Sequence, residues 1–405
     1  MKTPAVVVYI DNSFTFGGAI NSLNTVIGAL DKSKYRPVLV TAQKPAFLST
    51  HFAGIEWHHL DMKLPWIHNR YYKKISAMPF LQRSVFGQKV LKKLRSIFWL
   101  AAFTLPEALR LYRIGKKHKA RLVHLNNALG SQLSGIVAAK LMKVPCVAHL
   151  RDYEQPCRSA RANAARIDHH IAISASIKDN LLALGVSKDR ISVVYDAVDP
   201  DLPQTEGKGP KFREKKEDGN SPVLIGWFGR IIEWKGLREF VLGLKTFSET
   251  FSDFRAVVVG DPSDFGDRYY RSVRDLAEFL DLTDHIVFAG YQEDVMAIME
   301  QMDIIVHSSI TPEPFGMVII EAMACSKPVV ASAAGGGPLE IVRHGETGFL
   351  VDPKDPGQIS NVLATLAGDR KLREKYGSAG RKRVESVFSS RVQVRALEAV
   401  YDNLL

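Results

Sequence analysis

The sequence has 405 residues, of which 46% are hydrophobic and 24% are charged, the composition of a soluble globular protein. That length exceeds what one hydrophobic core ordinarily holds, so we expect two domains. The net charge is +11, yet the segment from Asp61 to Arg121 alone has 15 lysines and arginines against two acidic residues. The basic character is therefore local, which argues against nucleic-acid binding by the protein as a whole.

Neither a cleavable leader nor a membrane span is expected from the sequence. "PAVVVYI" near the start predicts a strand, and the longest apolar stretch, Ser96–Leu105, is about half as long as a spanning helix. The cysteines Cys146, Cys157 and Cys325 form no spaced framework, which predicts reduced thiols and a cytosolic protein.

Short apolar runs alternate with helical patterns, which predicts an α/β fold with parallel sheets covered on both faces. The strands predicted in the first half are Val6–Ile10, Val38–Thr41, Leu122–Leu125, Pro145–Leu150 and His170–Ile173. Those predicted in the second half are Val223–Phe228, Ala256–Val259, Ile286–Ala289, Ile304–His307 and Pro328–Ala331. The helical patterns include Ala19–Leu30, Ser131–Leu141 and Ser176–Leu184.

A polar segment without apolar periodicity, residues 201–222, indicates a linker between two domains. We expect a first domain over residues 1–200 and a second over residues 223–385. The last segment, residues 386–405, is expected to form a helix that packs back on the first domain. In open parallel sheets, ligands bind beyond the carboxyl ends of the strands, so the residues that follow each strand are candidates for a site.

Glycines and basic residues follow the first strand of each half. Gly17 and Gly18 open a helix, where free backbone N–H groups suit an anion, although a tight turn also explains the pair. In "GRIIEWKG", Arg230 and Lys235 suit a diphosphate, although they also fit a solvated surface pair.

One charge interrupts the apolar helical run in "EPFGMVIIEAMAC", namely Glu321. A carboxylate there costs free energy unless a partner compensates it. Its two oxygens match a ribose diol, whereas the alternative is a buried ion pair with a lysine or arginine. The first amides of the same helix, at residues 315–318, are free to bind an anion.

A histidine lies near the end of a predicted strand in "VPCVAHLRDY". His149 is followed there by Arg151 and Asp152. A histidine that faces the ligand edge of a sheet could touch a reacting group, whereas a satisfied structural histidine is the alternative.

In these motifs the sequence resembles the family-four retaining glycosyltransferases of GT-B fold. Glu313 and Glu321, followed by "KPVVASAAGGGPLEIVRHGETGFLVDP", are similar to the family's C-terminal signature. "GRIIEWKG" and "ISASIKDNL" occur in the expected order. The resemblance covers most of the chain and implies two Rossmann-like domains that face each other across a cleft.

The resemblance also implies roles for individual residues. Glu321 would bind the nucleotide ribose, Glu313 would lie beside the donor sugar, and Arg230 and Lys235 would hold the diphosphate. His149 would lie near the anomeric centre. The implied donor contacts through the backbone are at Gly17, Gly18, Tyr291, Phe315, Gly316, Met317 and Val318.

The implied reaction moves a sugar, with retention, from a UDP- or GDP-linked donor to a glycan or a lipid-linked acceptor in cell-envelope or exopolysaccharide biosynthesis. Domain closure would assemble the site. No cofactor and no metal are expected, because basic side chains neutralise the diphosphate. The Asp-x-Asp pattern at Asp199 and Asp201 lies at the start of the linker and is not expected to bind a metal. Nothing in residues 61–121 identifies the acceptor.

Residues 83–121 combine basic residues with apolar residues at helical spacing. The apolar positions are Phe86, Val90, Leu94, Ile97 and Ala101. Such a helix can lie on an anionic membrane surface, which would make the protein peripheral on the inner face of the cytoplasmic membrane. Alternatively, the apolar face packs into the first domain.

Two other functions remain open at this stage. A nucleotide-sugar epimerase of similar fold would need the nucleotide pocket but no acceptor surface. A basic membrane- or nucleic-acid-binding protein would account for the isoelectric point of about 9.4 but not for the paired glutamates. Turnover with and without an acceptor distinguishes the two enzymes.

Overall fold

The computed structural model describes residues 3–13, 18–42, 52, 54–60, 93–94, 96–127, 129–199, 210–213, 221–262 and 267–405. Its internal contacts divide the chain into two compact units. The first unit comprises Met1–Ile173, Ile177–Val194 and Val394–Leu405. The second comprises Ser174–Ser176 and Tyr195–Gln393. The chain thus changes unit at Val194, earlier than the expected linker, and most of that linker lies outside the described residues.

The sheet of the first unit is parallel throughout, with strand order β3-β2-β1-β4-β5-β6-β7. Its strands are β1 (Ala5–Asp11), β2 (Tyr35–Thr41), β3 (Glu56–His59), β4 (Ala120–Asn126), β5 (Cys146–Leu150), β6 (His169–Ala172) and β7 (Ile191–Val193). The sequence did not predict β3 and β7, because "EWHH" is polar and β7 has only three residues.

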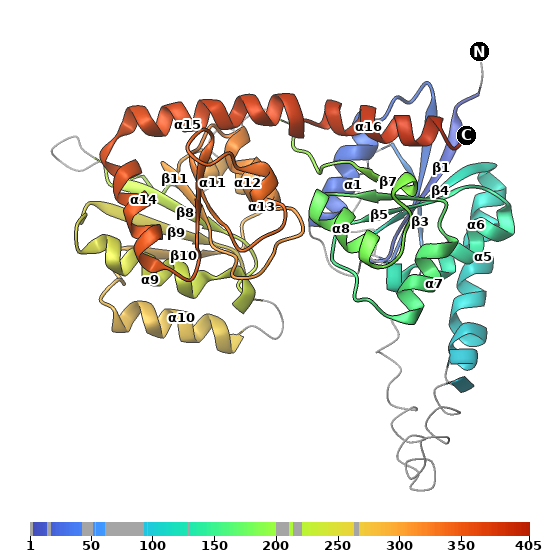
Figure 1. Ribbon diagram of the computed structural model, residues 1–405, viewed down its shortest axis with the longest axis horizontal. Coiled ribbons are helices and arrows are strands. Elements are labelled where there is room, and N and C mark those ends of the chain that lie inside the picture. Colours follow the sequence, from blue (N-terminus) through green and yellow to red (C-terminus); the bar gives the residue numbers. More distant parts are fainter. Residues whose placement is uncertain are drawn as a thin grey trace, which may run out of the picture. The chain divides into compact units, whose positions relative to one another are not determined.

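Helices cover both faces of this sheet (Figure 1). They are α1 (Gly18–Ala29), α5 (Leu105–His118), α6 (Leu133–Met142), α7 (Arg158–Arg166), α8 (Ala175–Ala183) and α16 (Ser390–Asp402). Shorter turns are η2 (Leu100–Thr104), η3 (Leu129–Ser131) and η4 (Lys188–Arg190). Alternate residues of β1 face different layers, because Tyr9 packs with α1 and α16 while Ile10 lies under α6.

The sheet of the second unit repeats the same topology, with order β10-β9-β8-β11-β12-β13. Its strands are β8 (Val223–Phe228), β9 (Phe254–Val259), β10 (Ile286–Gly290), β11 (Ile304–His307), β12 (Val329–Ser332) and β13 (Gly348–Val351). Its helices are α9 (Leu237–Ser248), α10 (Asp267–Phe279), α11 (Val295–Met299), α12 (Met317–Ala324), α13 (Pro338–Ile341), α14 (Pro356–Gly368) and α15 (Arg370–Arg383), with turns η5 (Glu233–Lys235) and η6 (Val384–Phe388). Helices α9, α10 and α14 share one apolar core with the sheet, and α12 packs against α15.

Both units are therefore doubly wound Rossmann-like folds, which confirms the predicted fold class. In each sheet the strand order reverses once, between β1 and β4 and between β8 and β11. Ligands of such folds bind at this switch point, beyond the carboxyl ends of the strands. None of the described helices is both long enough and apolar enough to span a membrane.

Candidate active site

The switch point of the second unit joins β8 and β11, whose carboxyl ends lead into two polar loops. Arg230 follows β8, is exposed, and makes no side-chain hydrogen bond or ion pair with a described residue. Lys235 follows in η5, where its ammonium lies 4.4 Å from the centre of the Trp234 ring. A guanidinium and an ammonium thus follow the same strand end.

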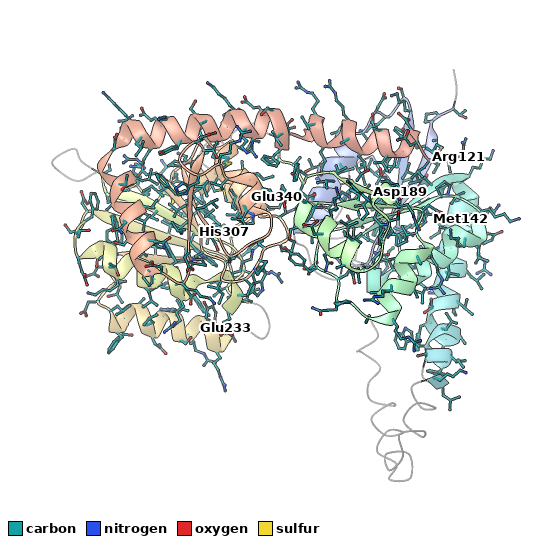
Figure 2. The ribbon with its side chains drawn as sticks, in the orientation of Figure 1. Arg121, Met142, Asp189, Glu233, His307 and Glu340 are labelled. Carbon is teal, nitrogen blue, oxygen red and sulfur yellow. The ribbon has the colours of Figure 1, made fainter. Side chains whose placement is uncertain are left out.

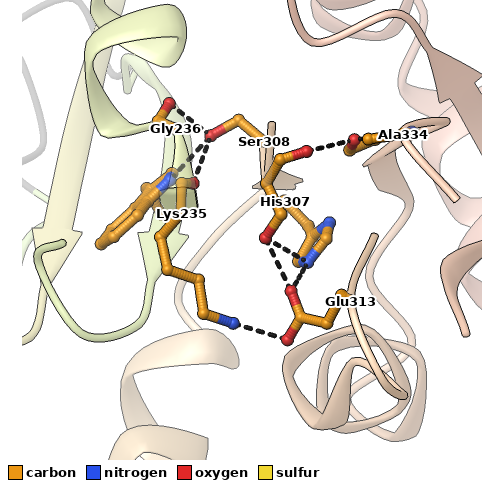
Figure 3. Close-up of polar contacts among 9 residues, drawn as sticks. Lys235, Gly236, His307, Ser308, Glu313 and Ala334 are labelled. Carbon is orange, nitrogen blue, oxygen red and sulfur yellow. Dashed lines mark hydrogen bonds and ion pairs between the residues drawn. The ribbon is translucent and has the colours of Figure 1, made fainter. Parts of the chain in front are cut away.

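The ammonium group of Lys235 belongs to a polar network that is centred on Glu313 (Figure 3). Its Nζ lies 2.5 Å from Glu313 Oε1. The other carboxylate oxygen of Glu313 lies 2.6 Å from His307 Nε2 and accepts a hydrogen bond of 2.6 Å from Ser309 Oγ. Both oxygens of Glu313 are therefore occupied by protein partners.

The network fixes the ionisation of Glu313. Burial alone would raise the pKa of this carboxyl, but His307 and then Lys235 outweigh burial and hold the pKa well below its usual range. Glu313 is therefore an anion that holds Lys235 in place.

Glycines let the loops approach closely around this network. The Gly236 carbonyl accepts from Ser308 Oγ at 2.7 Å, and a Cβ on Gly236 would lie 1.9 Å from the Ser308 oxygen. Gly337 N donates to the backbone carbonyl oxygen of Glu313 at 2.8 Å, and a Cβ on Gly336 would lie 1.9 Å from the same carbonyl oxygen. Larger residues would push the two loops apart, which explains these glycines of the signature.

Helix α12 begins beside this network. Its N-cap, Gly316, has φ 112° and offers no side chain to the first amides of the helix. In this turn Ile319 N donates to the Gly316 carbonyl oxygen at 2.9 Å. Phe315, just before the helix, packs between Tyr195 and Phe388. The amides of Met317 and Val318 thus stay available for an anion.

Glu321 lies in the second turn of α12. The residue is half-buried, and its side chain makes no hydrogen bond or ion pair with any residue in the described ranges. Burial of the carboxyl raises its pKa from 4.5 to about 7. The alternative of a buried pair with a lysine or arginine therefore does not hold for the described residues.

Glu340 has a structural partner rather than a ligand. Its carboxylate accepts from Ala175 N at 2.8 Å and from Ser176 N at 3.1 Å. Like His307, Glu340 belongs to the second unit, and both are labelled in Figure 2. Ala175 and Ser176 belong to the same compact unit as Glu340, so these hydrogen bonds lie within the second unit.

The switch point of the first unit holds a different network. Asn126, at the end of β4, donates to Asp11 at the end of β1 and accepts from Arg151 Nε at 2.8 Å. Arg151 NH1 also donates to Ser22 Oγ in α1 at 2.7 Å. The guanidinium is buried and hydrogen-bonded to the elements that surround it.

His149 is the second-last residue of β5, as the sequence predicted, and its role near the reacting sugar stays a prediction. It is 0% exposed, and its ring lies 5.4 Å from that of His124 inside the first unit. Neither ring nitrogen has a hydrogen-bond partner among the described residues. Burial, and then Arg151, hold the pKa of His149 well below its usual value, so the ring is neutral. Arg151 directly follows the end of β5.

Of the remaining residues that the sequence indicated, some lie within the described ranges and some lie outside them. Tyr291 is exposed after β10, and its backbone N–H donates to Asp261 at 3.0 Å. Gly18 is the first residue of α1. Gly17 and Asp201 lie outside the described residues, as do residues 61–92 of the basic segment.

Sequence reasoning missed several polar residues of the two switch points. They are Asp11, Asn126, His307 and Ser309. Each ends or follows a strand that flanks a switch point. The order of the strands in each sheet would therefore have been needed to find these residues from the sequence.

Two doubly wound units, one with a basic and acidic cluster at its switch point, define the GT-B class of glycosyltransferase. The family model of glycosyl transferases group 1 matches residues 209–383, and that of glycosyltransferase family 4 matches residues 16–202. The chain is 30% identical over 292 residues to a 2-deoxystreptamine glucosyltransferase of Streptomyces kanamyceticus, covering 66% of this chain and 72% of that protein. The chain belongs to this glycosyltransferase family, which confirms the resemblance.

The chain is also similar to other proteins. A capsular polysaccharide biosynthesis glycosyltransferase, CapM of Staphylococcus aureus, is 29% identical over 247 residues, which are 58% of this chain and 61% of CapM. The chain thus matches less than two thirds of the length of CapM. The crystal structure of HepE from Anabaena in complex with UDP and glucose superposes with a TM-score of 0.75 at 22% identity, over 98% of this chain and 99% of HepE. That likeness supports the fold.

Proposed function

We propose that the protein transfers a hexose from a UDP- or GDP-linked donor to a glycan or lipid-linked acceptor, with retention of configuration, in the synthesis of a cell-envelope or extracellular polysaccharide. The relationship to CapM, whose name assigns it to capsular polysaccharide biosynthesis, supports the class of product. The observation that carries the proposal is the Glu321 carboxyl, which has no protein partner in the described part of the chain.

A nucleotide diphosphate matches three features of the second unit. The hydroxyls of a ribose would satisfy the two oxygens of Glu321. The open amides of Met317 and Val318 suit an anionic oxygen, and Arg230 and Lys235 supply positive charge for a diphosphate. HepE, which shares the fold, was crystallised with UDP.

The chemistry follows from these charges. Negative charge builds on the departing diphosphate oxygen, where Lys235, Arg230 and the amides of α12 stabilise it. Glu313 is a poor nucleophile, because both of its oxygens already have partners. We therefore infer attack by the acceptor on the face from which the diphosphate leaves. The basic side chains neutralise the diphosphate without a divalent metal.

We place the acceptor step at a membrane surface. Leu94, Ile97 and Phe98 project apolar side chains, with Ile97 54% and Phe98 65% exposed, so they are not packed into the first unit. Exposed Arg110 and Arg113 follow in α5. An exposed apolar and basic surface favours anionic lipid, which fits a lipid-linked acceptor and a peripheral position on the cytoplasmic membrane.

The donor is tested by thermal-shift and calorimetric titration of UDP, GDP, ADP and their sugar conjugates, in EDTA. We expect one nucleotide to bind to the wild type, and binding to weaken at least about tenfold in Glu321→Ala. Exposed Glu249, at the end of α9, provides the control Glu249→Ala, which should bind normally. If no nucleotide binds, or if both variants bind like the wild type, the proposed site is wrong.

Two further assays test the rest of the proposal. Turnover of the bound sugar nucleotide only in the presence of an acceptor supports a transferase, whereas acceptor-free epimerisation supports the alternative. For the membrane, Phe98→Glu should lose salt-sensitive binding to anionic vesicles. Phe279, which is 83% exposed in the second unit, provides the control Phe279→Glu. Equal vesicle binding by both variants would exclude this surface.

A further inference from the structure

Three possible metal ligands meet in the first unit, away from the residues discussed so far. Glu56 and His58 belong to β3, and His118 is the last residue of α5. His58 Nε2 lies 3.0 Å from His118 Nε2, and Glu56 Oε1 lies 3.2 Å from His118 Nε2 and 3.8 Å from His58 Nε2. One possible ligand atom of each residue thus lies within 4.8 Å of the other two.

The fold explains why these side chains converge. Glu56 and His58 are two residues apart in a strand, so they lie on the same face of β3, while Trp57 and His59 lie on the other. Trp57 packs against the apolar core, which fixes the face on which Glu56 and His58 lie. The side chain of His118 is only 6% exposed, whereas that of Glu56 is 43% exposed and open to solvent.

The cluster lies on β3, the outermost strand of the sheet, two strands away from the switch point between β1 and β4. Glu56 begins β3, and His118 ends the helix that leads into the start of β4. Asp11 and Asn126, by contrast, end their strands. The cluster is therefore separate from the polar network at the carboxyl edge of this sheet.

The geometry points to a Zn²⁺ site formed by Glu56, His58 and His118, and we propose that the protein binds one zinc ion there. In tetrahedral zinc sites with nitrogen and oxygen ligands, neighbouring ligand atoms are about 3.3 Å apart. The three separations here, 3.0, 3.2 and 3.8 Å, lie around that value. Two imidazoles and one carboxylate are ligands that zinc prefers, and water would complete the coordination.

Some charges near the cluster favour a bound cation and others oppose it. The carbonyl end of α5 favours a cation, as does the Glu56 carboxylate. Arg36, which donates to the His118 carbonyl at 3.3 Å, and Lys117 oppose a cation, but both are exposed, so solvent screens their charges.

A hydrogen-bonded cluster without metal is the competing interpretation. One N–H on His118 Nε2 would then point between His58 and Glu56, and the His58–Glu56 separation of 3.8 Å would stay long. Zinc instead uses a lone pair from each of the three residues. It would link β3, the strand at the edge of the sheet, to the end of α5. The ion would stabilise the first unit and would take no part in neutralising the diphosphate.

The test uses the full chain, purified without a polyhistidine tag, freed of metal and titrated with Zn²⁺ against a chromophoric chelator. We expect one zinc per chain with a Kd of about 1 µM or tighter, and no comparable binding of Mg²⁺. His58→Gln and His118→Gln should each weaken zinc binding by more than about 100-fold, since even outer-shell changes cost 10- to 100-fold. Zinc should raise the Tm of the wild type and not of His58→Gln.

The control is His59→Gln, on the opposite face of the same strand, which should bind zinc like the wild type. If the buried His118→Gln variant fails to fold, the more exposed Glu56→Gln variant carries the test, with an expected loss of about 10-fold or more. The proposal is overturned if the wild type binds no zinc, binds it only with a Kd above about 100 µM, or binds it equally well in His58→Gln and His59→Gln.

Discussion

The carboxyl edges of the two sheets have the same strand order but different polar chemistry. In the second unit, Lys235, Glu313 and His307 form a charged network next to the open amides of α12. In the first unit, Arg151 and Asn126 hydrogen-bond to neighbouring elements. The strand order thus determines where polar residues gather, while their hydrogen-bond partners within the protein determine whether they are available to a ligand.

The largest effect is expected from Lys235→Met. Loss of the ammonium removes stabilisation of the departing diphosphate, so kcat should fall by about 10²- to 10³-fold. It also leaves Glu313 with one cationic partner fewer, which should lower the free energy of unfolding by about 3 kcal/mol. Steady-state kinetics and urea unfolding check these values. Unchanged kcat with reduced stability would make the network of the second unit structural, as in the first unit.

Glu321→Gln should produce the next largest effect, and one that depends on pH. The pKa of Glu321 is about 7 in the folded protein, against 4.5 when exposed. The folded state therefore binds more protons between those values, and wild-type stability falls as pH rises from about 4.5 to 7. At pH 8 the glutamine variant should be more stable by on the order of 3 kcal/mol, and at pH 4 equally stable.

Urea unfolding of the wild type and Glu321→Gln at both pH values measures this difference. Glu249→Gln is the control and should show no such dependence. An advantage of Glu321→Gln that is the same at pH 4 and pH 8 would contradict the burial of an ionised carboxyl. Glu321→Gln should also bind the nucleotide more weakly than the wild type. The ionised carboxyl of Glu321 would then lower the stability of the protein and favour nucleotide binding.

Arg151→Met tests the other half of the comparison. The change removes hydrogen bonds from a charged donor to Asn126 and Ser22, which should lower the free energy of unfolding by about 2 kcal/mol. Nucleotide affinity, measured by calorimetry, should stay within about twofold, since the donor groups belong to the second unit. A loss of nucleotide affinity without a loss of stability would show that Arg151 takes part in donor binding.

The smallest effect is expected from His149→Leu. The substitution removes two buried ring nitrogens that have no described partner, so the free energy of unfolding should rise by about 1 kcal/mol or stay unchanged. Turnover should be retained. A loss of turnover in a stable variant would instead support the role that the sequence suggested for this histidine near the reacting sugar.

The sequence was informative about the fold because parallel strands buried on both faces are apolar and easy to recognise. Strands β8 and β11 were predicted with their observed bounds. Strand β3 was missed because its residues alternate between a core tryptophan and a polar cluster, so it lacks an apolar run. Its assignment depends on pairing with β2, which the local sequence does not encode.

The sequence was less informative about the site because partners come from distant segments. The pattern singled out Lys235 and Glu313, but their ion pair joins loops that follow different strands. It indicated that Glu321 needs a partner, and only the structure shows that none of the described side chains provides one. The strand that contains His149 was predicted with its observed end at Leu150, but the sequence did not show that this side chain is fully buried, because burial depends on the helices that cover the sheet.

The last helix has a consequence for synthesis of the protein on the ribosome. Val394–Leu405 belong to the first unit, where Tyr401 Oη lies 3.1 Å from Tyr9 Oη and 2.7 Å from His124 Nδ1. The first unit therefore cannot complete its core until Val394–Leu405 have been translated, whereas the second unit has all of its residues earlier. The part made first is thus the part that finishes folding last.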